Sequence, residues 1–440
     1  MKTSIYNFVF DNGENYILYN AFSDEVIFMK EELYKIYTEN FHCVDNLKQI
    51  HPDFYHYLLI KKAIVDEGVT ESDLVVKKWE EHDYNSRTFT VTINPTMDCN
   101  MSCWYCYEQH GVNSKMSNDI SNRVLSFVEE LCTGNEYDTI ILSFFGGEPL
   151  LYFEELVYPL INKVSRVCIQ NNKELRTHFT TNGFLISEKI LKNIGEIPTS
   201  FQITLDGNAT IHNKTKIVKD KRETYLQTIN NIKMCLSNKH IVSVRLNFTE
   251  STLPYFVDVL SDFSDIDNEA KSLLCFNFQR IWQDKSRTQE EDLQVQIRKL
   301  ESLFCQQGFS ISPYTSNMFG RCYADKRDSI VVNYDGNVFK CTARKFTKEN
   351  RDGVIRDNGN IEWEERHAHR INLIYGNKTC RECRIYPLCH GGCSQCKIEN
   401  NDVENKCLKG FSDNDKLQLV QSRIKDILLV YNSQLERKKI

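Results

Sequence analysis

The stretch Cys99-Asn100-Met101-Ser102-Cys103-Trp104-Tyr105-Cys106 places three thiols within eight residues, at the spacing C-x3-C-x2-C. It follows the run 89–93, in which apolar and polar residues alternate as in a β-strand. Pro95 and Asp98 break that strand, so the thiols are expected on a loop at its end. Three close thiolates suit an iron–sulfur cluster, whereas zinc needs a fourth protein ligand, for which His110 is the neighbouring candidate. Three ligands to a four-iron cluster leave one iron open to a small molecule.

The overall composition is typical of a globular protein with room for two or three domains. The 440 residues are 41% hydrophobic and 26% charged, with a formal net charge of −6. Acidic and basic residues are mixed, which argues against a nucleic-acid partner. No apolar stretch reaches membrane-spanning length and the first residues lack an apolar signal core, so we expect a cytoplasmic protein without a membrane partner. Seventeen cysteines in such a chain favour metal or cluster ligation over disulfides.

Strand-like and helix-like segments alternate from residue 88 to about residue 308. The expected strands are Thr88–Asn94, Thr139–Phe145, Arg176–Thr180, Ser200–Leu205, Val242–Phe248 and Leu273–Gln279. Six βα units at this spacing predict an α/β fold, with a parallel sheet curled into a partial (βα)6, TIM-like barrel. Ligands in such folds bind at the carboxyl ends of the strands.

Three short motifs follow expected strands at those carboxyl ends. Gly146-Gly147-Glu148-Pro149 follows the second strand; its glycines allow close backbone approach, and its carboxylate could hold an ammonium group. Thr180-Thr181-Asn182-Gly183 and Thr204-Leu205-Asp206-Gly207 follow the third and fourth strands and have the composition of turns. The three motifs are therefore expected at one edge of the sheet, next to the thiols.

A second group of cysteines marks residues 309–410 as an expected separate domain. These cysteines are Cys322, Cys341, Cys380, Cys383, Cys389, Cys393, Cys396 and Cys407. The residues between the thiols at 380–393 are charged or glycine-rich, so the segment buries little apolar surface and is expected to be ordered by bound metal. The spacing alone leaves zinc and iron–sulfur clusters as open alternatives.

The remaining parts of the chain predict three simpler elements. Residues 1–66 have three strand-like runs followed by helical patterns, as in a winged-helix module, with a hairpin turn at Asp11-Asn12-Gly13. Residues 67–87 are polar and charged and predict a linker. Residues 411–440 predict an amphipathic terminal helix.

The cysteine loop and the strand-end motifs resemble those of the radical S-adenosylmethionine (radical SAM) enzymes. The resemblance implies that Cys99, Cys103 and Cys106 hold a [4Fe-4S] cluster whose open iron chelates SAM. It also implies that Tyr105 packs near the adenine and that Gly146, Gly147 and Glu148 meet the SAM amino group. Asn182, Thr204 and Asp206 would face the cofactor pocket. Many relatives have an arginine where this chain has Lys216, and a lysine cannot make the forked contact to a carboxylate, so the anchor of the SAM carboxylate stays unassigned.

The later cysteines are similar to the SPASM domain, which carries two auxiliary iron–sulfur clusters, expected here as [4Fe-4S]. By this resemblance Cys380, Cys383, Cys389 and Cys407 would hold the second auxiliary cluster. Cys322, Cys341 and Cys393 would hold the first. Cys396 would be its fourth ligand; otherwise one iron is open to substrate or water.

Together these resemblances imply an enzyme that modifies peptides by hydrogen abstraction. Relatives with a recognition module mostly install thioether, carbon–carbon or ether cross-links in ribosomally made peptides. The implied partners are a precursor peptide, whose leader docks on residues 1–66, and an electron donor such as flavodoxin or ferredoxin. Two alternatives stay open: a sulfatase-maturating enzyme that makes formylglycine, and a non-enzymatic metal-binding scaffold or redox sensor.

Overall fold

The computed structural model describes residues 1–111, 114–284, 290–312, 321–400 and 406–437. Contacts divide the chain into two compact units. The first unit comprises residues 1–85, 315–325 and 369–428, and the second comprises 86–314, 326–368 and 429–440. Each unit has its own hydrophobic core and is described separately below.

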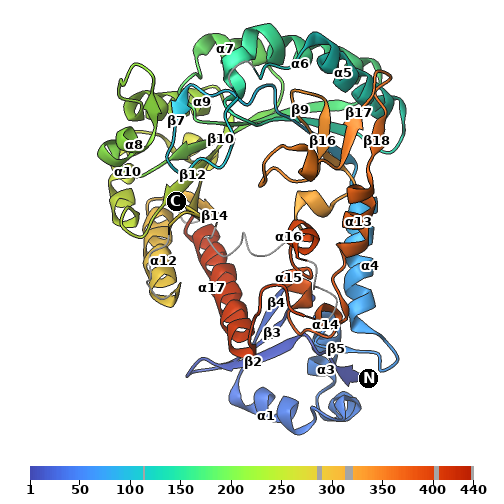
Figure 1. The fold of residues 1–440 in the computed structure, drawn as a ribbon. Coiled ribbons are helices and arrows are strands. Elements are labelled where there is room, and N and C mark those ends of the chain that lie inside the picture. The colour runs from blue at the N-terminus through green and yellow to red at the C-terminus, as the bar shows by residue number, and fades with distance from the viewer. Residues whose placement is uncertain (112–113, 285–289, 313–320, 401–405, 438–440) are drawn as a thin grey trace. The chain divides into compact units, whose positions relative to one another are not determined.

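The second unit is built on a mostly parallel sheet (Figure 1). Its central strands are β6 (Thr88–Ile93), β8 (Thr139–Phe144), β9 (Glu174–Thr181), β10 (Thr199–Leu205), β12 (Ile241–Phe248) and β13 (Leu274–Arg280). They lie side by side in sequence order, and every neighbouring pair is parallel. This order is that of successive βα units, so the prediction of an α/β partial barrel is confirmed.

Helices cover the sheet of the second unit, and Figure 1 shows α5, α6 and α7 together outside it. These helices and their neighbours are α5 (Asn118–Thr133), α6 (Tyr158–Gln170), α7 (Glu188–Ile194), α8 (Ala209–Thr215), α9 (Tyr225–Ser237), α10 (Phe256–Asp262), α11 (Asn268–Ser272) and α12 (Glu290–Gln306). Apolar side chains of the strands and of most of these helices form one continuous core. That core fixes the sheet, whose carboxyl-end loops carry the motifs.

The sheet continues beyond the predicted barrel. Strand β14 (Ser310–Ser312) pairs parallel with β13, and β15 (Ser329–Val332) pairs parallel with β6. Three further antiparallel strands follow: β16 (Asn337–Phe339), β17 (Gly353–Ile355) and β18 (Ile361–Trp363). Residues 326–368 therefore belong to the second unit, because their strands complete its sheet, whereas the sequence places them in a separate domain over 309–410.

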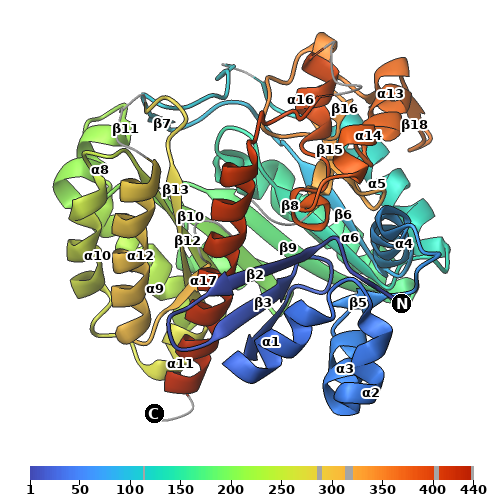
Figure 2. The same cartoon turned by 90° about the horizontal axis from the view of Figure 1, so that it is seen from below.

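The first unit begins with an antiparallel sheet of β2 (Asn7–Asp11), β3 (Tyr16–Asn20) and β4 (Glu25–Met29), of which β2 and β3 are seen together in Figure 2. Helices α1 (Glu31–Glu39), α2 (Leu47–Ile50) and α3 (Pro52–Ile60) follow, and β1 (Lys2–Thr3) pairs with β5 (Ile64–Val65). Three strands followed by helices match the pattern expected for a winged-helix-like module.

Residues 67–87 are mostly helical rather than a polar linker. Helix α4 (Glu71–Tyr84) buries Val75 and Trp79, which share a core with Tyr6 and Tyr19 of the module. The polar composition misleads because one narrow apolar stripe is enough to dock a helix. Two hydrogen bonds hold the start of α4 in place: Ser4 Oγ donates to the Glu71 carboxylate, and the Ile5 amide donates to it at 3.0 Å.

The same core takes in the cysteine-rich segment and the last helix. Short helices α13 (Glu365–Leu373), α14 (Lys378–Arg381), α15 (Tyr386–Cys389) and α16 (Ser394–Glu399) precede α17 (Asp413–Arg437). Tyr386 packs edge-on against Trp79 with ring centroids 5.0 Å apart, and Val420 and Ile424 of α17 are buried in this core. Within the described residues, no helix is both long and apolar enough to cross a membrane.

Candidate active site

A small antiparallel pairing holds the cysteine loop in place. Strand β7 (Met101–Ser102), in the middle of the loop, pairs with β11 (Ile217–Val218). Met101, Phe184 and Val218 form a buried cluster against which Cys99 and Cys103 pack. The thiols are therefore fixed next to the segment that carries Lys216.

One cavity of the second unit brings the predicted site residues together. It is lined by Cys99, Cys103, Tyr105, Cys106, Gly146, Gly147, Asn182 and Thr204, with Lys216, Arg245 and Arg280 among further residues. His110 also lines this cavity, with its Nδ1 3.2 Å from the Met97 carbonyl oxygen. The predicted residues Glu148 and Asp206 are not in the lining; they lie buried behind it.

The two glycines of the Gly-Gly-Glu-Pro turn pack against the cysteine loop. A Cβ on Gly146 would lie 2.5 Å from the Thr96 carbonyl oxygen, and one on Gly147 would lie 2.1 Å from that of Asp98. The amides of Gly147 and Glu148 donate to these same carbonyls at 3.0 and 2.8 Å. The two glycines are therefore needed where the backbones of two loops touch. The sequence interpretation instead assigns them to the close approach of a ligand.

The Glu148 carboxylate is directed into the protein rather than into the cavity. Its Oε1 accepts from the Thr181 hydroxyl at 2.8 Å and the Leu150 amide at 3.1 Å, and its Oε2 accepts from the Asn182 amide at 2.9 Å. Burial raises the pKa of Glu148, and these donors oppose that rise. The carboxylate therefore positions the turn after β9, which carries Asn182 into the cavity.

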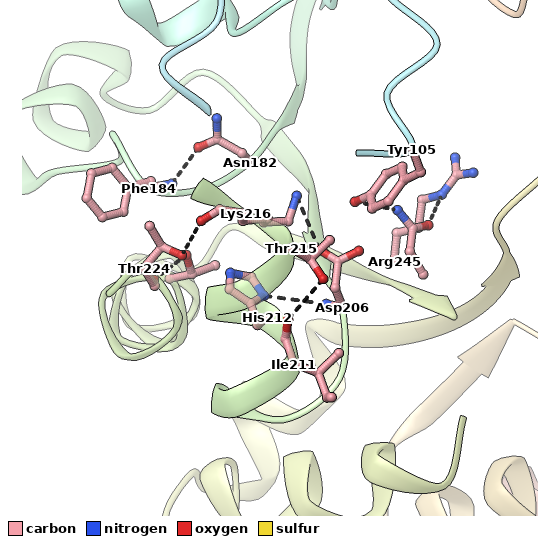
Figure 3. Close-up of polar contacts among 12 residues, drawn as sticks. Tyr105, Asn182, Phe184, Asp206, Ile211, His212, Thr215, Lys216, Thr224 and Arg245 are labelled. Carbon is pink, nitrogen blue, oxygen red and sulfur yellow. Dashed lines mark hydrogen bonds and ion pairs between the residues drawn. The ribbon is translucent and has the colours of Figure 1, made fainter. Parts of the chain in front are cut away.

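Asn182 connects that turn to the cysteine loop. Its Nδ2 donates to Asn100 Oδ1 at 2.8 Å and lies 4.0 Å from Cys99 Sγ, while its Oδ1 accepts from the Phe184 amide at 3.0 Å. The side chain is thus fixed at both ends, and Figure 3 shows its contact with Phe184.

Asp206 and Lys216 form a buried ion pair, in which Nζ lies 3.5 Å from Oδ2 (Figure 3). Their side chains are 2% and 4% exposed. Burial opposes the charged form of Lys216, but Tyr105, Asp206 and the thiols of Cys103 and Cys99 outweigh it and raise its pKa well above the ordinary value. The sequence interpretation left Lys216 without a role; its place in the cavity depends on the β7–β11 pairing, which the residue pattern does not reveal.

His212 supports this ion pair from within α8. The ring is fully buried, and its Nδ1 accepts from the Asp206 amide at 3.4 Å. Burial, and secondarily the charge of Lys216, holds the pKa of His212 well below its usual value, so the ring is neutral.

The three thiols are half-buried and lie beside the positive charge of Lys216. Burial raises the pKa of Cys99 to about 12 and raises those of Cys103 and Cys106, while Lys216 acts in the opposite direction on all three. Within the described part of the chain, no three histidine, cysteine or acidic side chains converge closely enough to bind a single metal ion. The thiols are instead spread around a cavity, which fits a cluster, whose ligands bind different irons.

The later cysteines lie in different parts of the two units. Cys380, Cys383, Cys389 and Cys407 lie together in the first unit, where Cys380, Cys383 and Cys407 all act electrostatically on Cys389. Cys322, Cys393 and Cys396 also belong to the first unit, whereas Cys341 belongs to the second. The four thiols of the predicted second auxiliary set are thus close neighbours.

Comparison with known proteins identifies the family of the domain that carries this cavity. Residues 93–260, from the end of β6 to α10, match the model of the radical SAM superfamily. Residues 93–260 are a radical SAM domain. The match contains the cysteine loop and the three strand-end motifs, which surround the cavity described above.

Relatives of this radical SAM enzyme include a cysteine-type anaerobic sulfatase-maturating enzyme of Clostridium perfringens. It is 23% identical over 347 residues, which cover 70% of this chain and 88% of the relative. A structure of anSMEcpe with bound AdoMet and the Kp18Cys peptide matches with a TM-score of 0.60 at 18% identity, over 79% of this chain and 99% of that chain. Streptococcus suis SuiB bound to S-adenosylmethionine matches with a TM-score of 0.52 at 16% identity, over 93% of this chain and 99% of that chain. Both structures share the fold.

Proposed function

We propose that this radical SAM enzyme modifies a ribosomally made precursor peptide, abstracting hydrogen from it to install a thioether, carbon–carbon or ether cross-link between side chains. The observation that carries the proposal is the cavity that joins three half-buried thiols to Lys216 and to the turns after β8, β9 and β10. An electron donor such as flavodoxin or ferredoxin would supply the reducing electron. When bound and cleaved by the reduced cluster, SAM would supply a 5′-deoxyadenosyl radical that takes one hydrogen atom from the peptide. The second electron lost on cross-linking would pass to an auxiliary cluster and the second proton to solvent.

Different residues of the cavity would hold the cluster and the separate groups of SAM. Cys99, Cys103 and Cys106 would ligate the [4Fe-4S] cluster. Lys216 would neutralise the SAM carboxylate, because this ammonium group acts on all three cluster thiols and the carboxylate must chelate the open iron. The backbone of Gly146 and Gly147 would meet the SAM amino group, with Glu148 as a positioning residue beneath them.

Tyr105 would border the adenosine part of the cofactor. Its hydroxyl accepts from Asn247 Nδ2 at 3.1 Å, and its carbonyl oxygen accepts from Gln283 Nε2 at 2.8 Å. Burial raises its pKa, so it remains a neutral phenol at ordinary pH. Thr204 on β10 lines the same cavity and offers a hydroxyl.

A leader peptide would dock on the three-stranded sheet of the first unit. One of its two outer strands is partly occupied: the Arg384 guanidinium donates to the carbonyl oxygens of Ile5 and Asn7, at the start of β2, and lies 4.2 Å from the Phe8 ring centroid. Within the described segments strand β4 pairs with β3 alone, so its outer edge is available for an added strand. Phe28 on β4 is 54% exposed.

The auxiliary clusters would be held mainly in the first unit. Cys380, Cys383, Cys389 and Cys407 are the proposed ligands of the second auxiliary cluster. Lys409 acts on Cys389, and Lys416 acts on Cys383, so positive charge surrounds thiols that must bind as thiolates. Cys322, Cys341 and Cys393 remain the proposed ligands of the first cluster, with Cys396 as the fourth.

Sulfatase maturation is the second candidate function. The relative from Clostridium perfringens and the fold of anSMEcpe favour it. The anSMEcpe match leaves 21% of this chain uncovered (100 − 79), whereas the SuiB match leaves 7% (100 − 93). We favour peptide maturation because this chain has an additional module, and a leader needs such a docking surface.

The test is anaerobic reconstitution with iron and sulfide, followed by reduction in the presence of SAM. The wild type should form 5′-deoxyadenosine, and Cys99→Ala, Cys103→Ala or Cys106→Ala should abolish it. Cys235→Ala, which removes a buried thiol of α9 outside the cavity, is the matched control and should retain cleavage. SAM cleavage by any of the three cavity variants would overturn the assignment.

A second arm of the test separates the two candidate functions. A precursor peptide encoded beside the gene and a sulfatase-derived cysteine peptide are each incubated with the reduced enzyme. Loss of two hydrogens with formation of a cross-link supports peptide maturation, and conversion of cysteine to formylglycine contradicts it. Because Tyr6 and Tyr19 share a core with Trp79 and Tyr386, docking is better tested by surface substitutions than by deleting residues 1–66.

A further inference from the structure

Arg245 lines the cavity of the second unit but takes no part in the cofactor assignments above. It lies on β12, where it pairs in register with Thr204 of β10, and its side chain is half-buried. Its Nε donates to Asn247 Oδ1 at 2.9 Å. Among the described residues, no carboxylate oxygen lies within 4.0 Å of its nitrogens. A guanidinium directed into a cavity without a counter-ion is unfavourable by itself.

Two other cationic side chains of the cavity are paired within the protein. Lys216 is paired with Asp206, and Arg280 Nε lies 3.2 Å from Asp284 Oδ2. Glu108 also lines the cavity, but neither of its carboxylate oxygens has a hydrogen-bond partner, so it does not neutralise Arg245. The cavity therefore presents a guanidinium whose Nη donors have no anion.

The position of Arg245 sets it apart from the cluster. Lys216 directly precedes β11, which pairs with β7 of the cysteine loop, whereas Arg245 lies on β12 and donates to Asn247. The groups that act on Arg245, after burial, are Tyr107, Tyr105 and Asp206. Figure 3 shows its guanidinium on the far side of the Tyr105 ring from Lys216. A carboxylate chelated to the open iron would thus lie near Lys216, which leaves Arg245 for a different anion.

The neighbours of Arg245 show where such an anion would come from. Tyr107 of the cysteine loop stacks on Trp282 beyond β13, with ring centroids 5.4 Å apart, and the two side chains are 36% and 62% exposed. This aromatic pair marks the part of the cavity lining that reaches solvent, where a peptide would enter. An anion bound at Arg245 would therefore belong to the substrate.

We propose that Arg245 is a recognition residue for a carboxylate of the peptide substrate, carried by an aspartate or glutamate side chain next to the residue that loses hydrogen. A planar guanidinium binds a carboxylate through two parallel hydrogen bonds, and the Arg245 Nη groups are the donors left for this contact. The inference rests on the proposed function and names the chemistry of its substrate.

The experiment measures binding rather than turnover. The reconstituted enzyme with SAM is immobilised without reductant and exposed to three pools of synthetic dodecapeptides. One pool has a single aspartate or glutamate among neutral residues, the second has asparagine or glutamine there, and both are amidated at the C-terminus. The third has no acidic side chain but a free C-terminal carboxylate. Mass spectrometry gives the ratio of retained peptides.

The wild type should retain acidic peptides about tenfold or more over their amide counterparts, as expected for a charge-assisted bidentate contact. Arg245→Gln should bring that ratio close to one, and Arg245→Lys should keep part of it. Arg176→Gln is the matched control, because Arg176 of β9 is 53% exposed and pairs with Glu174 at 2.8 Å. Preference for the third pool over the first would show that Arg245 binds the C-terminal carboxylate of the peptide, and it would overturn the side-chain assignment.

Two results would overturn the role of Arg245 itself. One is equal retention of acidic and amide peptides by the wild type, or an unchanged ratio in Arg245→Gln. The other is a loss of SAM affinity in Arg245→Gln by tenfold or more, measured by equilibrium dialysis, because Arg245 would then hold the cofactor. Failure of the proposed function is recognised separately, by absence of 5′-deoxyadenosine when the wild type is reduced with SAM.

Discussion

Gly147 packs so closely on Asp98 that a Cβ on the glycine would lie 2.1 Å from the Asp98 carbonyl oxygen and 2.7 Å from the Met97 carbonyl carbon. The turn after β8 and the cysteine loop therefore touch backbone to backbone at this position. The same turn contains Glu148, which positions Asn182. Any side chain at position 147 must move the loop that holds the three thiols.

Gly147→Ala should therefore impair the radical SAM cluster site. The added methyl cannot be accommodated because the atoms it meets are backbone, so the loop must shift. We expect iron content to fall by about four atoms per chain, the contents of one such cluster, with loss of SAM cleavage. Gly68→Ala is the control, because no atom lies within 4 Å of a Cβ built there. Full cluster loading of Gly147→Ala would contradict this account.

Lys216→Met should weaken SAM binding by about tenfold or more, because the cofactor carboxylate loses its cation. It also leaves Asp206 buried and unpaired, which costs about 3–5 kcal/mol of stability. Equilibrium dialysis with labelled SAM should therefore include the double variant Lys216→Met/Asp206→Asn, which removes the unpaired charge. Lys216→Arg keeps the cation and should retain binding. Wild-type affinity in a folded double variant would refute Lys216 as the anchor.

His212 predicts a pH dependence of stability. Burial, together with the charge of Lys216, holds the pKa of His212 well below its usual value of about 6.5. The unfolded chain therefore binds a proton below pH 6.5 that the folded chain does not, and the free energy of unfolding should fall as pH falls. One such group contributes a slope of up to about 1.4 kcal/mol per pH unit.

His212→Asn tests that slope, because asparagine can still accept from the Asp206 amide but does not titrate. Urea unfolding of the reconstituted protein between pH 5 and 7 should show a shallower pH dependence than the wild type. The exposed His42, changed to asparagine, serves as the control and should leave the slope as it is. Parallel curves for wild type and His212→Asn would contradict the prediction.

Phe28→Glu tests the docking edge of the first unit. Phe28 lies exposed on β4, and a charge there should lower the affinity for a leader-bearing precursor peptide by about tenfold, measured by fluorescence anisotropy. Reduction with SAM should still give 5′-deoxyadenosine, since the radical SAM cavity lies in the second unit. Val9→Glu on β2, where Val9 is 38% exposed, is the control. A larger loss with Val9→Glu would assign docking to the β2 edge.

Much of the second unit follows from local sequence. The thiol spacing at 99–106, the strand runs and the strand-end motifs depend on residues close together in the chain, so their periodicity predicts β6, β8, β9, β10, β12 and β13 to within two residues at each end. Because parallel strands end at one edge, the motifs also had to meet there. The helix at 71–84 was missed because its few buried residues form only a narrow stripe in a polar segment.

By itself, then, the sequence determined the barrel, the cysteine loop and the place of the motifs. Only the tertiary structure decided that the Glu148 carboxylate holds the β9 turn, that Lys216 lies buried against Asp206, and that Arg245 has no counter-ion among the residues the structure describes. It also assigned residues 326–368 to the sheet of the second unit. The physical reason is that strand periodicity is a local property, whereas the partner of a buried charge is chosen by segments that only folding brings together.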